Sequence, residues 1–227
     1  MIKSHQSQFV KFNLTKISLL TIFTLIFMFS LNSLEGFLLK FFNIKGESWI
    51  NLFDEKVFLW INNSNLNIAT LMLTITYAGS TISWFGAAIF LWFLKKRKTA
   101  FLLIFVLLIS GVLTFFMKIA FHRVRPFQIL LEAKVLDKEE DFSFPSGHSV
   151  SSFSSATILG RKNRKISLCL YVFASLVAYS RIYVGVHWPS DVIFGGLIGV
   201  LISFLILKLK KKILNFFINE TIKEKST

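Results

Sequence analysis

The chain has 227 residues, of which 54% are hydrophobic and 17% are charged, and its mean hydropathy is +0.62. In a soluble domain about a quarter of the residues are charged, so this composition indicates a membrane protein. The formal net charge of +14 does not indicate a nucleic-acid-binding protein, because the basic residues fall in short blocks between apolar segments. The single cysteine, Cys169, excludes an internal disulfide bond.

Six apolar segments divide the chain, and about 20 apolar residues suffice to cross roughly 30 Å of hydrocarbon. The segments are Ile17–Leu39, Ile68–Leu94, Ala100–Phe121, Ser146–Leu159, Ile166–Val184 and Pro189–Leu207. No small-residue cleavage site follows Leu34, so we expect the first segment to be a retained helix and not a signal peptide. The fourth segment is rich in serine, which predicts a helix packed centrally among others. The prediction is an all-α fold: an integral membrane six-helix bundle that forms one domain over residues 1–227.

Four basic blocks predict how this bundle lies in the membrane. They are Lys3 with Lys11 and Lys16, the run 95–98, the run 161–165, and Lys208 with Lys210, Lys211 and Lys212. With six spans all four blocks fall on one side, which the positive-inside rule assigns to the cytoplasm. The acidic stretch 137–141 then falls on the outer side. We therefore predict a multi-pass protein of the cytoplasmic membrane, with both termini in the cytoplasm.

Between the first two segments, Phe41–Asn65 lies on the predicted outer side. Its aromatic and aliphatic side chains alternate with Asp54, Glu55 and Lys56. This pattern favours a short amphipathic helix in the headgroup layer. A helix packed over the end of the bundle would explain the pattern equally well.

The first polar cluster ends the third segment. Lys118 is followed seven residues later by Arg125, and Pro126 then restricts Arg125 to an extended or turn conformation. Two such cations could hold an anion, or they could simply extend to the lipid headgroups.

The second cluster, Pro145-Ser146-Gly147-His148, opens the fourth segment. Ser146 is a good N-cap, and Gly147 lets a ligand approach the backbone closely. The free N–H groups of a helix start attract an anion, and His148 could reach that anion as an acid. The alternative is an ordinary helix start with a histidine at the membrane interface.

The third cluster lies between the last two segments and contains Ser180, Arg181, His187 and Asp191. His187 and Asp191 are four residues apart, so the carboxylate can face the imidazole from one helical turn later. An aspartate on one ring nitrogen leaves the other free as a nucleophile. The alternative is a helix-start aspartate favoured by the dipole. The three clusters together offer three cations, two histidines and one carboxylate, which are the groups that phosphoryl transfer needs.

These clusters, Lys-x6-Arg-Pro, Pro-Ser-Gly-His and Ser-Arg-x5-His-x3-Asp, resemble the three signature motifs of the type 2 phosphatidic acid phosphatase family, which shares its site with vanadium haloperoxidases. The resemblance covers residues 118–191 and implies a metal-independent reaction without a cofactor. It implies that His187 is the nucleophile that forms a phosphohistidine, oriented by Asp191, and that His148 is the general acid. It also implies that the phosphate is held by Lys118, Arg125, Arg181, Ser146 and Gly147.

One position departs from the family pattern, since His122-Arg123-Val124 stands where many relatives carry another Arg-Pro pair. Arg123 is a candidate for contact with a distal phosphate. The loop 127–144 is the expected place for substrate specificity, which the sequence does not decode.

The resemblance implies an integral membrane lipid phosphatase whose active site lies at the outer face of the cytoplasmic membrane. Its partners would be the bilayer and a lipid phosphate, with undecaprenyl diphosphate preferred. Alternatives are a lipid A phosphatase, a phosphatidylglycerophosphate or phosphatidic acid phosphatase, and a lipid phosphotransferase. A haloperoxidase would gain nothing from six lipid spans, and a transporter would place its charges at the bilayer midplane and not at the segment ends. The sequence leaves the oligomeric state open.

Overall fold

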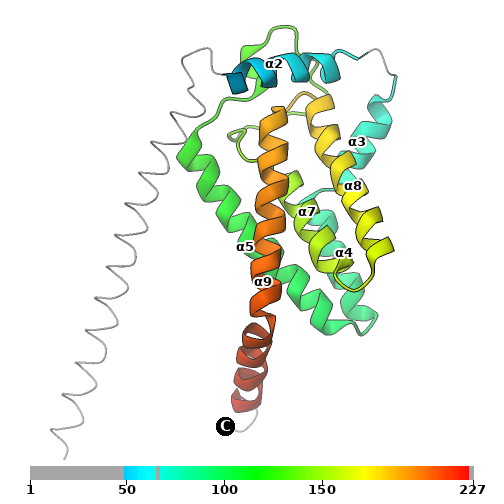
Figure 1. The fold of residues 1–227 in the computed structure, drawn as a ribbon, viewed down its shortest axis with the longest axis vertical. Helices are drawn as coiled ribbons and strands as arrows, with labels where there is room; N and C mark the ends of the chain where they lie inside the picture. The colour runs from blue at the N-terminus through cyan, green and yellow to red at the C-terminus, as the bar shows by residue number, and fades with distance from the viewer. Residues whose placement is uncertain (1–48, 65–66, 225–227) are drawn as a thin grey trace, which may run out of the picture. The chain divides into compact units, whose positions relative to one another are not determined.

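The structure is a computed structural model of the chain, and it describes residues 49–64 and 67–224, within the compact unit Trp49–Thr227. All regular secondary structure in these residues is helical, which confirms the predicted all-α class. The helices are α2 (Trp49–Asn62), α3 (Ala69–Ala78), α4 (Thr81–Phe93), α5 (Arg97–Phe121), α6 (Pro126–Ile129), α7 (Gly147–Gly160), α8 (Arg164–Tyr183) and α9 (Pro189–Glu224) (Figure 1).

Three helical stretches are long and apolar enough to cross a membrane: Arg97–Ile129, Arg164–Tyr183 and Pro189–Lys210. The pair α3 and α4 passes the same test only as one span that is bent by 52°. Helix α7 has 14 residues and is therefore only about 21 Å long. The first predicted segment, Ile17–Leu39, lies outside the described residues. The described helices thus supply up to four spans, and the total of six stays a prediction.

Helix α7 lies at the centre of the bundle, where it packs against α5, α8 and α9 (Figure 1). Its serines are buried, because small side chains allow neighbouring helices to come close. A Cβ atom at Gly199 of α9 would lie 2.4 Å from the carbonyl oxygen of Val150, so only glycine permits this approach. The Ser154 hydroxyl also donates to the Gly199 carbonyl at 3.2 Å. The fourth segment is central, as its composition predicted.

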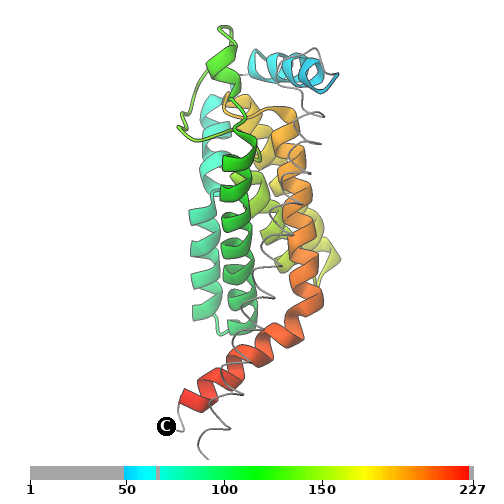
Figure 2. The same ribbon diagram turned by 90° about the vertical axis from the view of Figure 1, so that its left-hand side faces the viewer.

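Helix α2 lies across one end of the bundle, in contact with α8 and α9 (Figures 1 and 2). It presents Asp54 and Phe58 to the interior, and both side chains are buried. Phe58 packs on Trp188, with ring centroids 5.5 Å apart. The opposite face exposes Phe53 and Trp60. The helix therefore covers the bundle with one face and presents aromatic side chains to the surroundings with another.

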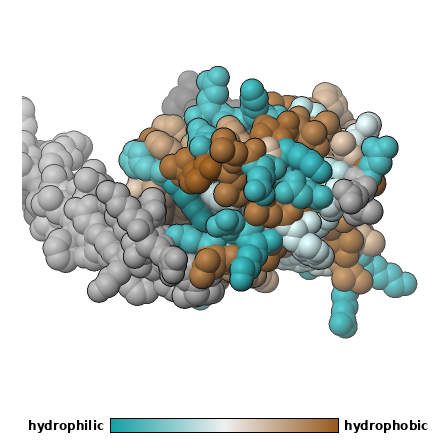
Figure 3. All heavy atoms as spheres, turned by 90° about the horizontal axis from the view of Figure 1, so that it is seen from above, coloured by the Kyte–Doolittle hydropathy of each residue, from teal (hydrophilic) through white to brown (hydrophobic). Residues whose placement is uncertain are grey.

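The two ends of the bundle differ in charge: one end carries both acidic and basic residues, and the other carries two basic runs. The end that carries α2 also carries the end of α5, the loop 130–146 and the turn between α8 and α9 (Figures 1 and 2). The backbone N–H of Ser146, just before α7, donates to the Asp191 carbonyl at 3.2 Å and so lies at this end too. Seen from above, this end mixes hydrophilic with hydrophobic side chains (Figure 3). The opposite end carries the basic runs 95–98 and 161–165 (Figure 1). All three polar clusters of the sequence therefore reach the α2 end, as the segment count predicted.

Candidate active site

His187 and Asp191 form the buried base of the site. His187 lies in the short turn between α8 and α9, and Asp191 lies in the first turn of α9. Both side chains are almost completely shielded from solvent. Nδ1 of His187 lies 3.5 Å from Oδ2 of Asp191 and has no hydrogen-bond partner among the described residues. A shift of about 0.5 Å would turn this ion-pair contact into a hydrogen bond.

Donors on three sides hold the Asp191 carboxylate. The backbone N–H of Trp188 donates to Oδ2 at 2.9 Å, and the Ser143 hydroxyl donates to the same oxygen. The guanidinium of Arg123 donates to Oδ1 at 2.5 Å. A buried carboxylate with this many donors stays ionised and fixed in direction. It can therefore orient the imidazole of His187.

Arg125 faces the other ring nitrogen of His187. The end of α5 is set by His122, whose left-handed backbone (φ 45°) stops the helix before Arg123. Arg125 is therefore not two turns further along α5, but precedes the short helix α6 in an extended conformation. Its Nη1 atom donates to the Val186 carbonyl at 2.7 Å and lies 3.4 Å from Nε2 of His187. The guanidinium is completely buried beside the nucleophile candidate.

Arg181 and Lys118 complete the cationic wall. Arg181 is completely buried near the end of α8, and its Nε atom has no hydrogen-bond partner among the described residues. Its Nη1 atom donates to Asp137 at 3.1 Å. Lys118, in the last turn of α5, donates to Asp141 at 2.6 Å. The three predicted cations therefore gather around one volume, although they come from separate parts of the chain.

Glu139 occupies the centre of this wall. Its carboxylate pairs with Arg125 at 2.5 Å and with Arg181, lies 3.5 Å from Nε2 of His187, and lies 4.0 Å from Nδ1 of His148. Arg125 and Arg181 are two of the predicted phosphate-binding residues, and His187 and His148 are the predicted nucleophile and acid. The carboxylate oxygens of Glu139 therefore lie where phosphate oxygens are expected. Burial alone would raise the pKa of the Glu139 carboxyl, but His187, Arg181 and Arg125 lower that pKa far below its usual value.

Ser146 and Gly147 form the start of α7 beside the cations. Ser146 is the N-cap by position, but its side chain makes no capping hydrogen bond. Its hydroxyl is buried and lacks a hydrogen-bond partner among the described residues. A Cβ atom at Gly147 would meet nothing closer than 3.9 Å, so the backbone here is open to a ligand. The free hydroxyl and the helix start suit an anion.

The residues behind Asp191 were not predicted from the sequence. Arg123, a candidate from the sequence for contact with a distal phosphate, pairs in the structure with Asp54 of α2 and with Asp191, each at 2.5 Å. Asp54 also accepts hydrogen bonds from the backbone N–H of Ser190 at 2.8 Å and from its hydroxyl at 2.5 Å. The signal in the sequence was an aspartate spaced four residues from Ile50 and from Phe58, on the buried face of α2. Burial raises the pKa of Asp54, and Arg123 opposes this rise.

A groove of about 630 Å³ leads from the cationic wall between α5 and α7 toward the flank of the bundle. Lys118, His148 and Glu139 line its polar end, and Leu107 and Phe115 line its apolar part. Phe115 is exposed, so the groove opens on the surface that would face lipid. The arrangement can therefore hold a phosphate at one end and an apolar chain along the other.

Comparison with known proteins agrees with the family resemblance of the three motifs. The model of the PAP2 superfamily matches residues 99–214. An undecaprenyl-diphosphatase of Sulfolobus acidocaldarius is 35% identical over 171 residues, which cover 74% of this chain and 82% of the relative. A phosphatidylglycerophosphatase B of Bacillus subtilis is 29% identical, with 69% of this chain and 79% of the relative covered.

Two crystal structures share the fold. The LpxE of Aquifex aeolicus is 33% identical with a TM-score of 0.65, over 69% of this chain and 95% of the other. A PAP2-type phosphatidylglycerolphosphate phosphatase of Bacillus subtilis is 26% identical with a TM-score of 0.66, over 81% of this chain and 96% of the other. The motifs, the helical fold and these relatives agree: the chain belongs to the PAP2 superfamily and is a membrane lipid phosphatase.

Proposed function

We propose that this enzyme removes the terminal phosphate of a membrane-embedded isoprenoid diphosphate such as undecaprenyl diphosphate. The observation that carries the proposal is the groove that runs from Lys118 and His148, at the edge of the cationic wall, to apolar side chains on the flank of the bundle. Such a groove suits a substrate whose headgroup is a phosphate and whose tail stays in the bilayer. Relatives named as undecaprenyl-diphosphatases support the choice, including the one from S. acidocaldarius and BcrC of B. subtilis, which is 30% identical over 43% of this chain.

In the proposed reaction Nε2 of His187 attacks the terminal phosphorus. Nε2 is the attacking atom because Nδ1 faces Asp191, while Nε2 faces the place where Glu139 now lies. The bond between the phosphorus and the bridging oxygen breaks, and His148 donates a proton to the departing lipid phosphate. Water then attacks the phosphorus of the phosphohistidine and gives a proton to the now neutral His148. The bond between phosphorus and Nε2 breaks, which releases inorganic phosphate and restores the free imidazole of His187.

Lys118, Arg125 and Arg181 would bind the phosphoryl oxygens and stabilise the charge that develops on them. Two buried guanidinium groups can each present a pair of donors to two oxygens. The Ser146 hydroxyl and the Gly147 backbone N–H would complete the binding site. Since the cations are held in place before substrate arrives, little reorganisation is needed at the transition state.

In the proposed membrane arrangement the chain has six spans, and α2 lies in the headgroup layer at the outer face of the cytoplasmic membrane. The exposed side chains of Phe53 and Trp60 support this position for α2. The basic runs at the opposite end would then face the cytoplasm, as would both termini. Single cysteines near Asp137 and near Asn163, in a Cys169→Ser background, test the orientation in intact cells. An impermeant reagent should label the site near Asp137. Labelling of the site near Asn163 alone would mean that the active site faces the cytoplasm.

A lipid A phosphatase is the second candidate, because the chain also resembles proteins named as lipid A phosphatases. One is the lipid A 1-phosphatase of Porphyromonas gingivalis, which is 34% identical over 39% of this chain. Phosphate release from a panel of purified lipids distinguishes the candidates. The panel contains undecaprenyl diphosphate, lipid A, phosphatidylglycerophosphate and phosphatidic acid. We expect the highest kcat/KM with undecaprenyl diphosphate, and a higher value with lipid A would replace the first proposal with the second. Transfer of phosphate to an acceptor other than water would instead identify a phosphotransferase.

A further inference from the structure

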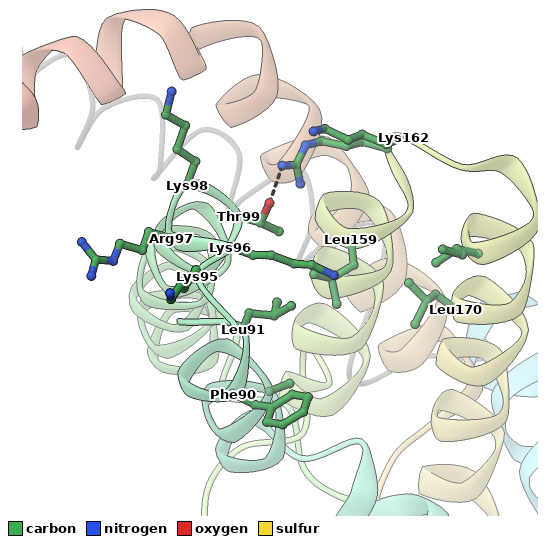
Figure 4. A pocket seen from close by; sticks show the side chains of 13 residues that line it. Phe90, Leu91, Lys95, Lys96, Arg97, Lys98, Thr99, Leu159, Lys162 and Leu170 are labelled. Atoms are coloured by element: carbon green, nitrogen blue, oxygen red, sulfur yellow. Dashed lines mark hydrogen bonds between the residues drawn. The ribbon is translucent and has the colours of Figure 1, made fainter. Parts of the chain in front are cut away.

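A second and larger cavity lies at the end of the bundle opposite the active site. It has a volume of about 820 Å³ and lies between the loop that joins α4 to α5 and the turn that joins α7 to α8 (Figure 4). Six basic residues line its rim, and no acidic residue of the described part of the chain does. They are Lys95, Lys96, Arg97, Lys98, Arg161 and Lys162. Like charges so concentrated repel one another unless an anion lies between them.

The rim is partly fixed in place. Arg161 donates to the Thr99 hydroxyl at 2.9 Å and to the Ile158 carbonyl, so it ties the α7–α8 turn to the first turn of α5. Lys96 reaches across the mouth of the cavity toward Leu159 (Figure 4). None of the six basic side chains forms an ion pair with a carboxylate in the described part of the chain. Their charge is therefore available to a ligand.

The walls below the rim are apolar. Phe90 and Leu91 come from α4, and Leu159, Ile166 and Leu170 come from α7 and α8. The side chain of Phe90 is 62% exposed, and that of Ile166 is 50% exposed. The walls therefore continue onto the outer flank of the bundle, which faces lipid. A soluble anion would use the rim but leave these walls uncovered, whereas a lipid would cover both.

We infer that this cavity binds an anionic glycerophospholipid of the surrounding leaflet, with its phosphate among the rim cations and an acyl chain against the apolar walls. Basic pockets between membrane helices suit such headgroups in general. The bound lipid would join α4, α5, α7 and α8 at the end remote from catalysis. It is not the substrate, since neither histidine of the active site lines this cavity.

The test measures lipid binding to the detergent-purified full chain by native mass spectrometry, with phosphatidylglycerol and phosphatidylethanolamine as probes. The variant is Lys96→Gln with Lys162→Gln. The matched control is Lys208→Gln with Lys210→Gln, which removes the same charge from exposed positions of α9 outside the cavity. Each lysine near an anionic headgroup contributes a factor of about five to binding, so the cavity variant, which lacks two, should bind phosphatidylglycerol about 25-fold more weakly. The control should bind it as the wild type does.

Three outcomes would overturn the inference. Equal losses in the two variants would mean that the basic end attracts anionic lipids without a defined site. Equal binding of phosphatidylethanolamine and phosphatidylglycerol to the wild type would mean that the rim does not select for negative charge. Soluble glycerophosphate that competes as strongly as the intact lipid would mean that the site takes a free anion and no acyl chain.

One further variant tests the apolar walls alone. Leu170→Trp fills the lower part of the cavity and leaves every rim cation in place. It should weaken phosphatidylglycerol binding at least fivefold. The midpoint of thermal unfolding should be unchanged, and the rate of phosphate release should stay within twofold of the wild-type rate. Unchanged lipid binding in this variant would contradict the placement of the acyl chain.

Discussion

Arg123 donates to Asp191 at 2.5 Å, from the side of the carboxylate away from His187. The same guanidinium pairs with Asp54 on α2, so one cation joins the covering helix to the start of α9. Arg123 and His187 therefore contact different oxygens of the Asp191 carboxylate, Oδ1 and Oδ2 respectively. The direction in which Asp191 points depends on α2 being in place.

This relationship predicts that Arg123 positions Asp191 without touching substrate. Arg123→Gln should lower kcat about 100-fold, as expected when a catalytic group is misplaced by about 1 Å, and should change KM little. Arg123→Lys should recover part of the loss, because it restores one donor and the charge. Steady-state kinetics in detergent micelles separates kcat from KM. A raised KM with unchanged kcat would show instead that Arg123 binds the substrate.

A second prediction concerns Glu139, which occupies the place of the phosphate in this structure. Substrate must displace this carboxylate, so Glu139→Gln should lower KM and strengthen inhibition by inorganic phosphate several-fold. The control is Glu132→Gln, which removes the same charge from an exposed position of the same loop. Unchanged KM and phosphate inhibition in Glu139→Gln would mean that the loop does not compete with substrate.

The pKa of Glu139 gives the sign of a pH effect on stability. Because the folded protein lowers this pKa below its usual value of 4.5, the ionised carboxylate stabilises the fold above about pH 4.5. That contribution is lost as the pH falls toward the lowered value. Between pH 6 and pH 4 the melting temperature of the wild type should therefore fall more than that of Glu139→Gln. Parallel pH profiles for the two proteins, measured without phosphate, would contradict the ion pairs at Glu139.

The groove predicts a dependence on the lipid tail. Gly111 lines the groove, and a Cβ atom there would meet nothing within 4 Å. A larger side chain at this position can therefore be accommodated, and it would occupy part of the groove. Gly111→Leu should raise KM about tenfold for a long isoprenoid diphosphate but not for a short soluble one, because only the long tail loses apolar contact area. Gly86→Leu is the control, since Gly86 also has open space and lies outside the groove. Equal effects on both substrates would place the tail elsewhere.

That side chains within one motif contact one another was predictable from short spacings, such as the four residues from His187 to Asp191, while the catalytic roles of the motif residues stay a prediction. The helical class and the central place of α7 were also predictable, from apolar length and small side chains. The pairing of Arg123 with Asp54 was not, because it joins residues that are 69 positions apart. The place of Glu139 was not predictable either, since it depends on how a loop without regular periodicity folds over the cations.

His148 should show its role through the leaving group. An acid that protonates the departing oxygen matters more for a poor alcohol leaving group than for a departing phosphate. His148→Ala should therefore lose at least tenfold more kcat/KM on a lipid phosphomonoester than on a diphosphate. Equal losses would mean that His148 binds or positions the phosphate and is not the acid.

The measurement that tests the account most directly is isolation of the phosphoenzyme. Enzyme mixed with a diphosphate lipid labelled in its terminal phosphate and quenched in alkali should carry label that is stable to base and lost in acid, as expected for a phosphohistidine. Peptide mapping should place the label on His187, and His187→Ala should carry none while it retains its helical content. Label on another residue, or wild-type phosphate release by His187→Ala, would contradict His187 as the nucleophile.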